Sequence, residues 1–431
     1  MTDTGRPLSL MDRLRASWFG AFSSLIIARA IASAATFLTI AVLGRTLGPA
    51  HYGDLVVLLT ILKIASEFIG PALDTALVRF VGAARDDEQS AITFANAVLR
   101  AKAALAIATV LLGLALALPI QRLLFARDGV EISSTAIIIA FVAAALTVLA
   151  MYAQSCFQAW QRFTGYARFE VAAASLRLFS IVALVLLATD SILALFVAYA
   201  AAPIVVALCA TPWLPSTKNA VVTPAVWRDL AHFAKWVVVD CACTSLAQRV
   251  DILLVAGNKL PPELVSQYGA AVQLTLLGDL VIITLFNVLL PKASRLTTRA
   301  ELLGFLRSFR LPTLFAFAGL LPLLLASGVI AHVTFGADYT QTGTLFSILL
   351  VGAAFALGSA PAGATLYGLG HSRTIAALEC FKLLAILIGG AFAVPAYGVV
   401  GMAWTVAVVR GALGVATYAM AYHHARHLES T

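Results

Sequence analysis

Long apolar stretches dominate this sequence and leave little polar chain between them. A helix needs about 20 apolar residues to cross the hydrocarbon core of a bilayer, because each residue adds only about 1.5 Å. Glycine and proline interrupt the apolar pattern at several places, such as Gly48-Pro49 and Pro261-Pro262. We predict an all-α integral membrane protein with about twelve transmembrane helices, near residues 20–43, 54–80, 91–118, 133–158, 166–188, 191–212, 229–257, 266–290, 309–333, 342–368, 373–395 and 399–421.

The low share of charged residues excludes a soluble multi-domain protein. Only 12% of the residues are charged and 61% are hydrophobic, whereas a soluble domain carries roughly 25% charged residues. The first apolar stretch is too long for the apolar core of a signal peptide, so we expect no cleavable signal. All five cysteines lie in apolar segments, and no pair has zinc-site spacing. We interpret them as small buried side chains, and we expect neither a metal site nor a cofactor.

The distribution of lysine and arginine between the loops predicts the orientation in the membrane. If the N-terminus is cytoplasmic, the loops on the opposite side carry only Arg45, Arg122, Arg127 and Lys259, and the cytoplasmic segments carry far more basic residues. Cytoplasmic loops are enriched in lysine and arginine. We therefore predict that both termini are cytoplasmic.

The two halves of the chain resemble each other. Tyr52-Gly53 and Tyr268-Gly269 each open a predicted span, and an arginine follows each tyrosine 27 residues later, at Arg79 and Arg295. Glu170 and Glu379 also occupy corresponding places. Parallel repeats of this kind enclose a substrate path between them. We predict two six-helix lobes around a central cavity, divided as an interfacial segment 1–18, an N-terminal lobe 19–213, a linker 214–228, a C-terminal lobe 229–422 and a tail 423–431.

Polar residues recur on one face of the second predicted span. Thr60, Lys63, Glu67 and Asp74 share this face, and Gly70-Pro71 predicts a bend in the helix. Ionisable side chains at membrane depth are costly, so they usually face a wet cavity or a partner. We predict that this face lines the cavity; a Lys63–Glu67 pair that only joins helices is the alternative.

Basic residues in the spans predict a cavity of positive character. Arg29 lies in the first span, and Arg249 lies beside Asp240, Thr244, Gln248 and Asp251 in the seventh. Arg29, Lys63 and Arg249 would suit a phosphate or diphosphate. Glu67, Asp74, Asp240 and Asp251 would balance these charges or carry coupling protons.

Further basic residues lie within the predicted spans. Arg177 and Arg410 lie midway along theirs, where each could reach the cavity or bind carbonyl oxygens of a neighbouring helix. For Lys102 we predict that the side chain reaches the membrane interface. Lys382 lies three residues after Glu379, so we predict a local ion pair there.

Sequence motifs of common enzyme classes are missing. The chain has no P-loop, no G-x-S-x-G, no H-E-x-x-H and no dinucleotide-binding glycine run. We therefore predict no catalytic residues and no enzyme activity.

A series of short motifs resembles those of the Wzx-type polysaccharide flippases of the multidrug/oligosaccharidyl-lipid/polysaccharide (MOP) superfamily. The first is Leu43-Gly44-Arg45-Thr46-Leu47-Gly48-Pro49-Ala50-His51-Tyr52-Gly53. The others follow in the family's order: Gln248-Arg249-Val250-Asp251, Tyr268-Gly269-Ala270-Ala271, Leu290-Pro291-Lys292, Phe335-Gly336-Ala337-Asp338-Tyr339, Leu369-Gly370-His371-Ser372-Arg373 and Tyr397-Gly398-Val399-Val400-Gly401. The likeness covers nearly the whole chain.

This resemblance implies a multi-pass protein of the bacterial inner membrane with the two-lobe fold of multidrug (MATE) and other MOP transporters. The implied function is to flip undecaprenyl-diphosphate-linked oligosaccharide for O-antigen or exopolysaccharide synthesis by alternating access. The implied partners are this lipid-linked substrate, membrane lipid, and the polysaccharide polymerase and export machinery, with no nucleic acid. A cation-coupled multidrug or metabolite antiporter of the same superfamily and a membrane-embedded polymerase or ligase are the alternatives.

Overall fold

The computed structural model describes residues 10–84, 87–125, 132–189, 191–216, 221–293, 296, 298–369 and 371–427. These ranges contain helices and no strands, which confirms the predicted all-α membrane fold. The helices are α1 (Leu10–Glu67), α2 (Gly70–Ala83), α3 (Glu88–Leu124), α4 (Ser134–Ala159), α5 (Phe163–Leu186), α6 (Ile192–Ala210), the short 3₁₀ helix η1 (Thr211–Trp213), α7 (Pro224–Ala247), α8 (Val250–Gly257), α9 (Pro262–Ala293), α10 (Arg299–Ser308), α11 (Arg310–Leu325), α12 (Ser327–Phe335), α13 (Thr342–Gly368) and α14 (Ser372–His427). Arg127, Arg295, Gly370 and parts of the predicted segments 1–18, 214–228 and 423–431 lie outside the described residues.

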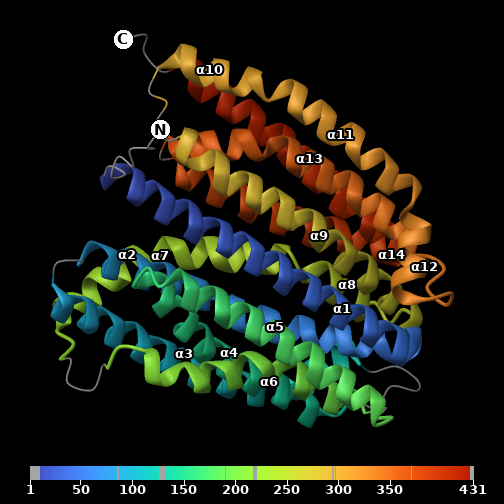
Figure 1. Ribbon diagram of the computed structural model, residues 1–431. Helices are drawn as coiled ribbons and strands as arrows, with labels where there is room; N and C mark the ends of the chain where they lie inside the picture. The colour runs from blue at the N-terminus through green and yellow to red at the C-terminus, as the bar shows by residue number, and fades with distance from the viewer. Residues whose placement is uncertain are drawn as a thin grey trace, which may run out of the picture.

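Helices α1 and α14 are each interrupted by a glycine with a left-handed backbone. Gly48 has φ 65° and Gly398 has φ 60°, values that residues with a Cβ atom rarely adopt. The rings of His371 and His424, at the two ends of α14, lie only 4.0 Å apart, so the two arms of α14 run antiparallel. Figure 1 shows α1 crossing the bundle from the end where α14 finishes, and the chain then returning to α2 at that end. Both helices are therefore hairpins in which the glycine makes the turn.

Other breaks divide the predicted spans. Helix α1 ends at Glu67 and α2 begins at Gly70 with Pro71 in its first turn, which confirms the predicted bend. The predicted span 229–257 is divided into α7 and α8, and the predicted span 309–333 bends by 58° between Leu325 and Ser327. From Leu10 onward, the predicted interfacial segment continues into the first span without a break.

The number of membrane crossings follows from helix length and apolarity. Within the described ranges, seven helical stretches are long and apolar enough to cross, or up to nine if each of two bent pairs is one span. Two of the seven, Ile27–Ala83 and Arg373–Arg426, contain the glycine hairpins. Helix α9 has 32 residues, which corresponds to about 48 Å of helix. The count of twelve crossings stays a prediction.

The helices form two bundles that lie side by side. In the N-terminal bundle, α1 packs against α4 and α5, and α3 packs against α4. In the C-terminal bundle, α13 packs against α9 and α14, and α14 also contacts α7 and α8. Figure 1 shows α3 to α6 on one side and α9 to α14 on the other, with α1 and α7 between them. The exact limits of the two lobes, at residues 19, 213, 229 and 422, stay predictions.

The two bundles touch directly at the end of the molecule where α8 and α12 lie (Figure 1). The Tyr339 hydroxyl donates a hydrogen bond to the Gly44 carbonyl at 2.8 Å. The Tyr52 ring packs against both Phe335 and Tyr339, with ring centres 5.9 and 6.2 Å away. The Arg45 guanidinium donates to the carbonyls of Thr334 and Val333. We call this set of contacts the far-end contact.

The far-end contact explains why two of the sequence motifs occur together. The motif around Gly48-Pro49 forms the turn of the α1 hairpin, and the Phe335–Tyr339 motif forms the connection between α12 and α13. A Cβ atom on Gly53 would lie 2.6 Å from the Pro262 carbonyl oxygen. The absence of a side chain at Gly53 therefore lets α1 lie directly against the start of α9.

This close approach predicts opposite effects for two glycine substitutions. Gly53→Ala should lower the free energy of unfolding by about 1–3 kcal/mol, because α1 must move away from the Pro262 backbone. Gly82→Ala is the control: its Cβ would meet nothing within 4 Å, and alanine favours the helix by about 1 kcal/mol. Thermal unfolding of the detergent-solubilised protein measures both. Equal melting temperatures for the two variants would contradict the tight packing.

Candidate functional site

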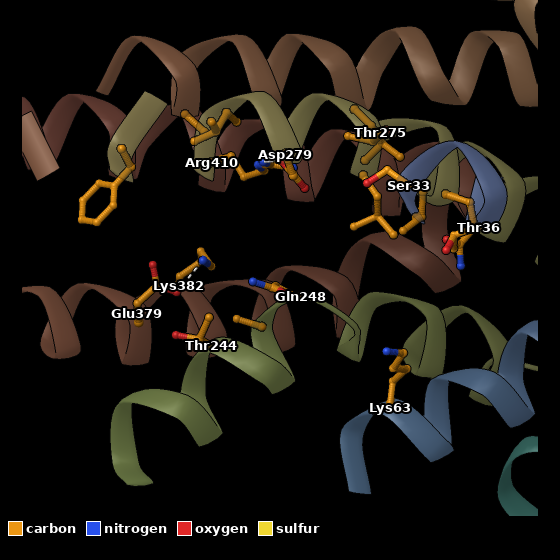
Figure 2. Close-up of a pocket in the computed structure, with 18 of the residues that line it drawn as sticks. Ser33, Thr36, Lys63, Thr244, Gln248, Thr275, Asp279, Glu379, Lys382 and Arg410 are labelled. Carbon is orange, nitrogen blue, oxygen red and sulfur yellow. Dashed lines mark hydrogen bonds and ion pairs between the residues drawn. The ribbon is translucent and has the colours of Figure 1, made fainter. Parts of the chain in front are cut away.

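A cavity of about 910 Å³ lies between the two bundles (Figure 2). Its lining comes from α1, α4, α5 and α6 on the N-terminal side and from α7, α8, α9, α13 and α14 on the C-terminal side. Ligand cavities of proteins are commonly about 300–1,000 Å³. The cavity is therefore large enough for a ligand of several rings, and both bundles would contact that ligand.

The charged residues of the lining do not give the cavity a positive excess. Among the described residues, four cations line it, namely Lys63, Arg177, Lys382 and Arg410. Five carboxylates line it as well: Glu170, Asp240, Asp251, Asp279 and Glu379. The positive character predicted from the sequence is wrong for this lining, because three of the carboxylates, Glu170, Asp279 and Glu379, were not counted in that prediction.

Lys63 lines the cavity, whereas Glu67 and Arg249, which the sequence analysis placed in the same site, do not. The Lys63 ammonium lies 3.2 Å from Glu67, and Glu67 also lies 3.5 Å from the Arg249 guanidinium. Neither Glu67 nor Arg249 belongs to the lining. Arg249 precedes the first turn of α8, so this three-residue network joins α1 of one bundle to α8 of the other.

Arg29 also lies outside the lining. Its side chain is 47% exposed, and its guanidinium lies 3.8 Å from the Glu170 carboxylate and 3.4 Å from the Tyr166 hydroxyl. Glu170 itself lines the cavity. The structure thus places Arg29 beside a cavity residue and not in the cavity wall.

Arg177 and Arg410 both reach the cavity, but they differ in their partners. Arg410 forms an ion pair with Asp279. Arg177 donates its Nε–H to the Tyr199 carbonyl at 3.3 Å, and its guanidinium lies 4.3 Å from the centre of the Tyr199 ring. No carboxylate lies within ion-pair distance of Arg177 in the part of the chain that the structure describes. Arg177 therefore combines the two predicted roles, because it binds a carbonyl oxygen and still presents a charge to the cavity.

The two predicted carboxylates of the seventh span both line the cavity. Asp251 is buried and accepts hydrogen bonds from the Tyr268 hydroxyl at 2.7 Å and from the Ile252 N–H at 2.8 Å. The bond from Tyr268 holds α8 against α9. Asp240 is half-buried and has no hydrogen bond or ion pair with any other described residue.

Sequence reasoning missed some of the lining carboxylates. Glu170 and Glu379 occupy corresponding places in the two halves of the sequence, and that correspondence was the available signal. Asp279 is a lone carboxylate in an apolar stretch, which is itself an indication of function in a membrane helix. The predicted local pair of Glu379 and Lys382 is confirmed at 2.5 Å. Figure 2 shows this pair facing Arg410 and Asp279 across the cavity.

Asp74 and Thr60 do not line the cavity, which corrects the prediction of one continuous polar face. Thr60 is buried and donates its hydroxyl to the Val56 carbonyl of its own helix. Asp74 lies beyond the break between α1 and α2. Its carboxylate contacts Lys102 on α3 and Ser155 on α4, and it does not belong to the cavity lining.

Asp74 belongs instead to a buried cluster between α2, α3 and α4. The Lys102 ammonium lies 2.6 Å from the Asp74 carboxylate, and its side chain is 0% exposed. Lys102 also donates to the Val148 carbonyl at 3.1 Å, and the Ser155 hydroxyl donates to Asp74 at 2.5 Å. The prediction that Lys102 reaches the membrane interface is therefore wrong, because a carboxylate on the neighbouring helix binds it inside the bundle.

Comparisons with known proteins agree with this architecture. An inward-facing multidrug resistance transporter of the MATE family superimposes with a TM-score of 0.77 at 14% identity, over 94% of this chain and 99% of that one. The lipid II flippase MurJ in an inward closed conformation superimposes with a TM-score of 0.75 at 14% identity, over 92% of this chain and 86% of that one. At this identity the likeness shows the fold alone.

The sequence itself assigns the family. Residues 20–297 match the family model described as "Polysaccharide biosynthesis protein", and the chain belongs to that family. A putative O-antigen transporter from Shigella flexneri is 27% identical over 195 residues, which are 43% of this chain. The match spans about half of that relative's length, 46%. The resemblance indicated by the sequence motifs is thereby confirmed.

The buried Lys102–Asp74 pair predicts a large effect on stability. Lys102→Met leaves the Asp74 carboxylate without its cation inside the bundle, and should lower the free energy of unfolding by about 3–5 kcal/mol. Lys102→Met combined with Asp74→Leu removes both charges and should recover most of the loss. Thermal unfolding in detergent measures all three proteins. If the single and double variants melt at the same temperature, the two residues do not depend on each other.

Proposed function

We propose that this protein is a flippase that moves undecaprenyl-diphosphate-linked oligosaccharide across the bacterial inner membrane. The observation that carries the proposal is the cavity of about 910 Å³, with cations and carboxylates in its lining, between two helical bundles that touch at one end. A glycan and a diphosphate cannot cross hydrocarbon without hydrogen-bonding partners, since each unsatisfied polar group costs several kcal/mol there. A cavity of this kind supplies those partners along part of the path.

Family membership supports the same proposal. The chain belongs to a family described by polysaccharide biosynthesis, and its partial relative from Shigella flexneri is described as a putative O-antigen transporter. We extend these descriptions to the whole chain and propose that it serves O-antigen or exopolysaccharide synthesis. Its proposed partners are the lipid-linked oligosaccharide, the surrounding lipid, and the polysaccharide polymerase and export machinery.

The proposed mechanism is alternating access. In one state the far-end contact stays closed, and the cavity takes up the substrate from the cytoplasmic side, where both termini would lie. Arg177 and Lys63 attract the diphosphate, because guanidinium and ammonium groups form charge-assisted hydrogen bonds with phosphate oxygens. Separation of the far-end contact then exposes the cavity to the other side, with the lobes 19–213 and 229–422 moving as two bodies. The substrate crosses without chemical change.

A second function is favoured by one specific observation. The lining holds five carboxylates and four cations among the described residues, and carboxylates in a membrane cavity suit organic cations or a coupling ion. A cation-coupled multidrug or metabolite antiporter is therefore the competing function. Loss of an antiporter would increase sensitivity to organic cations and leave the surface polysaccharide intact.

Deletion of the gene in the native host tests the flippase proposal. We expect the surface polymer to disappear and the lipid-linked repeat unit to accumulate in the cytoplasmic leaflet. The measurements are immunodetection of the polymer and labelling of the lipid from each side of the membrane. Normal surface polymer without accumulation of the lipid would contradict the flippase function.

Complementation of that deletion tests the role of Arg177. Arg177→Ala should lower export roughly tenfold or more, because it removes the lining cation that no described carboxylate neutralises. Arg100→Ala is the matched control, since Arg100 is exposed on α3 and lies outside the lining. Protein amounts in the membrane are compared in parallel. Full export by the Arg177→Ala protein would exclude this arginine from substrate binding.

A further inference from the structure

The two sides of the cavity differ in charge. Among the described lining residues, the N-terminal bundle contributes two cations, Lys63 and Arg177, and one carboxylate, Glu170. The C-terminal bundle contributes two cations, Lys382 and Arg410, and four carboxylates: Asp240, Asp251, Asp279 and Glu379. The part of the lining that the C-terminal bundle contributes, here called the C-terminal wall, therefore has a negative excess, and the part that the N-terminal bundle contributes has a positive excess.

The cations of the C-terminal wall are already paired with carboxylates. Lys382 lies 2.5 Å from Glu379, and Arg410 is bound to Asp279. A ligand anion on this wall would have to replace one of these carboxylates as a partner. A ligand anion at Lys382 would also lie within electrostatic range of Asp240, whose charge no described cation neutralises by direct contact.

Asp240 belongs to this negative part of the lining. It lies on α7, within electrostatic range of Glu379 and Lys382 on α14. An ionised carboxylate only accepts hydrogen bonds, so a ligand with hydroxyl groups would satisfy Asp240, whereas a ligand with carboxylate groups would not. Because the effective dielectric constant near a protein wall is lower than that of bulk water, two carboxylates placed side by side there repel each other more strongly than they do in bulk water.

Aromatic side chains line the same cavity as these carboxylates. Tyr367 and Phe286 both line the cavity, and their rings meet edge to face with centres 5.5 Å apart. Tyr367 lies within electrostatic range of Asp240 and Glu379. An aromatic ring offers a large rigid apolar surface, and carboxylates beside it accept hydrogen bonds from hydroxyls. A pyranose has both features, since its C–H groups form an apolar face and its hydroxyls project around the ring edge.

We propose that this wall, defined by Asp240, Glu379, Lys382, Tyr367 and Phe286, binds the glycan, and that it selects neutral glycans over glycans with acidic sugars. This inference rests on the proposed flippase function and adds the chemical class of the glycan. The diphosphate would bind on the opposite, positive wall at Arg177. The unequal charge of the two walls thereby orients the substrate across the cavity.

Transport of two matched lipids tests the selection. The full-length protein is purified and placed in phospholipid vesicles with polyprenyl-diphosphate trisaccharides that differ in one sugar, glucose in the first and glucuronate in the second. The rate at which each glycan becomes accessible to a membrane-impermeant reagent is measured. We expect the neutral lipid to move at least roughly tenfold faster, because like charges placed together at a binding surface are strongly unfavourable.

Variants of Asp240 connect the selection to this wall. Asp240→Asn keeps the side-chain shape and should reduce the preference for the neutral lipid, and Asp240→Lys should reduce it further or reverse it. Asp229→Lys makes the same charge change at an exposed position of α7 outside the lining, and should leave the preference as it is. Because the readout is a ratio of two rates, a variant with less folded protein still reports the preference.

The outcomes separate this inference from the function on which it rests. If neither lipid moves, the flippase proposal fails and the inference fails with it. If both lipids move at the same rate, or the acidic lipid moves faster, the protein is a flippase but the glycan selection is overturned. An unchanged preference in both Asp240 variants would also overturn the assignment of this wall.

Discussion

The cost of an isolated charge in a bilayer determines much of this structure. Water is absent from the hydrocarbon, so an ionised side chain there needs a partner or a polar cavity. Lys102 meets this requirement through Asp74 on a neighbouring helix, and Glu67 meets it through one cation from each bundle. These pairs fix how the helices are rotated against one another, because a helix turned by even one residue would lose its partner.

The same constraint connects the cavity to the proposed function. Arg177 and Asp240 are charged groups of the lining without an oppositely charged side chain in direct contact, within the ranges that the structure describes. They lie on different bundles. A substrate that carries an anion at one end and hydroxyls at the other would bind both groups at once, the anion at Arg177 and a hydroxyl at Asp240. At one end of the molecule the far-end contact holds the two bundles together, through Tyr52, Tyr339 and the backbone of the α1 turn.

Local features were predictable from the sequence, whereas contacts between helices were not. The bend at Gly70-Pro71 follows from a proline that cannot continue the preceding helix. The ion pair of Glu379 and Lys382 follows from a spacing of three residues on one helix. Lys102 was assigned to the interface because its partner Asp74, 28 positions earlier in the chain, is adjacent only after α2 and α3 have packed.

By itself, the sequence determined that the chain is a helical membrane protein with the motifs of its family, because apolar length and glycine or proline breaks are properties of consecutive residues. The tertiary structure decided which charges face the cavity. In the structure, four residues predicted for the site lie outside the lining: Arg29, Arg249, Glu67 and Asp74. Four others lie in it: Glu170, Asp279, Glu379 and Lys382. Periodicity places a residue on a face of its helix, but only packing decides whether that face meets another helix, lipid or the cavity.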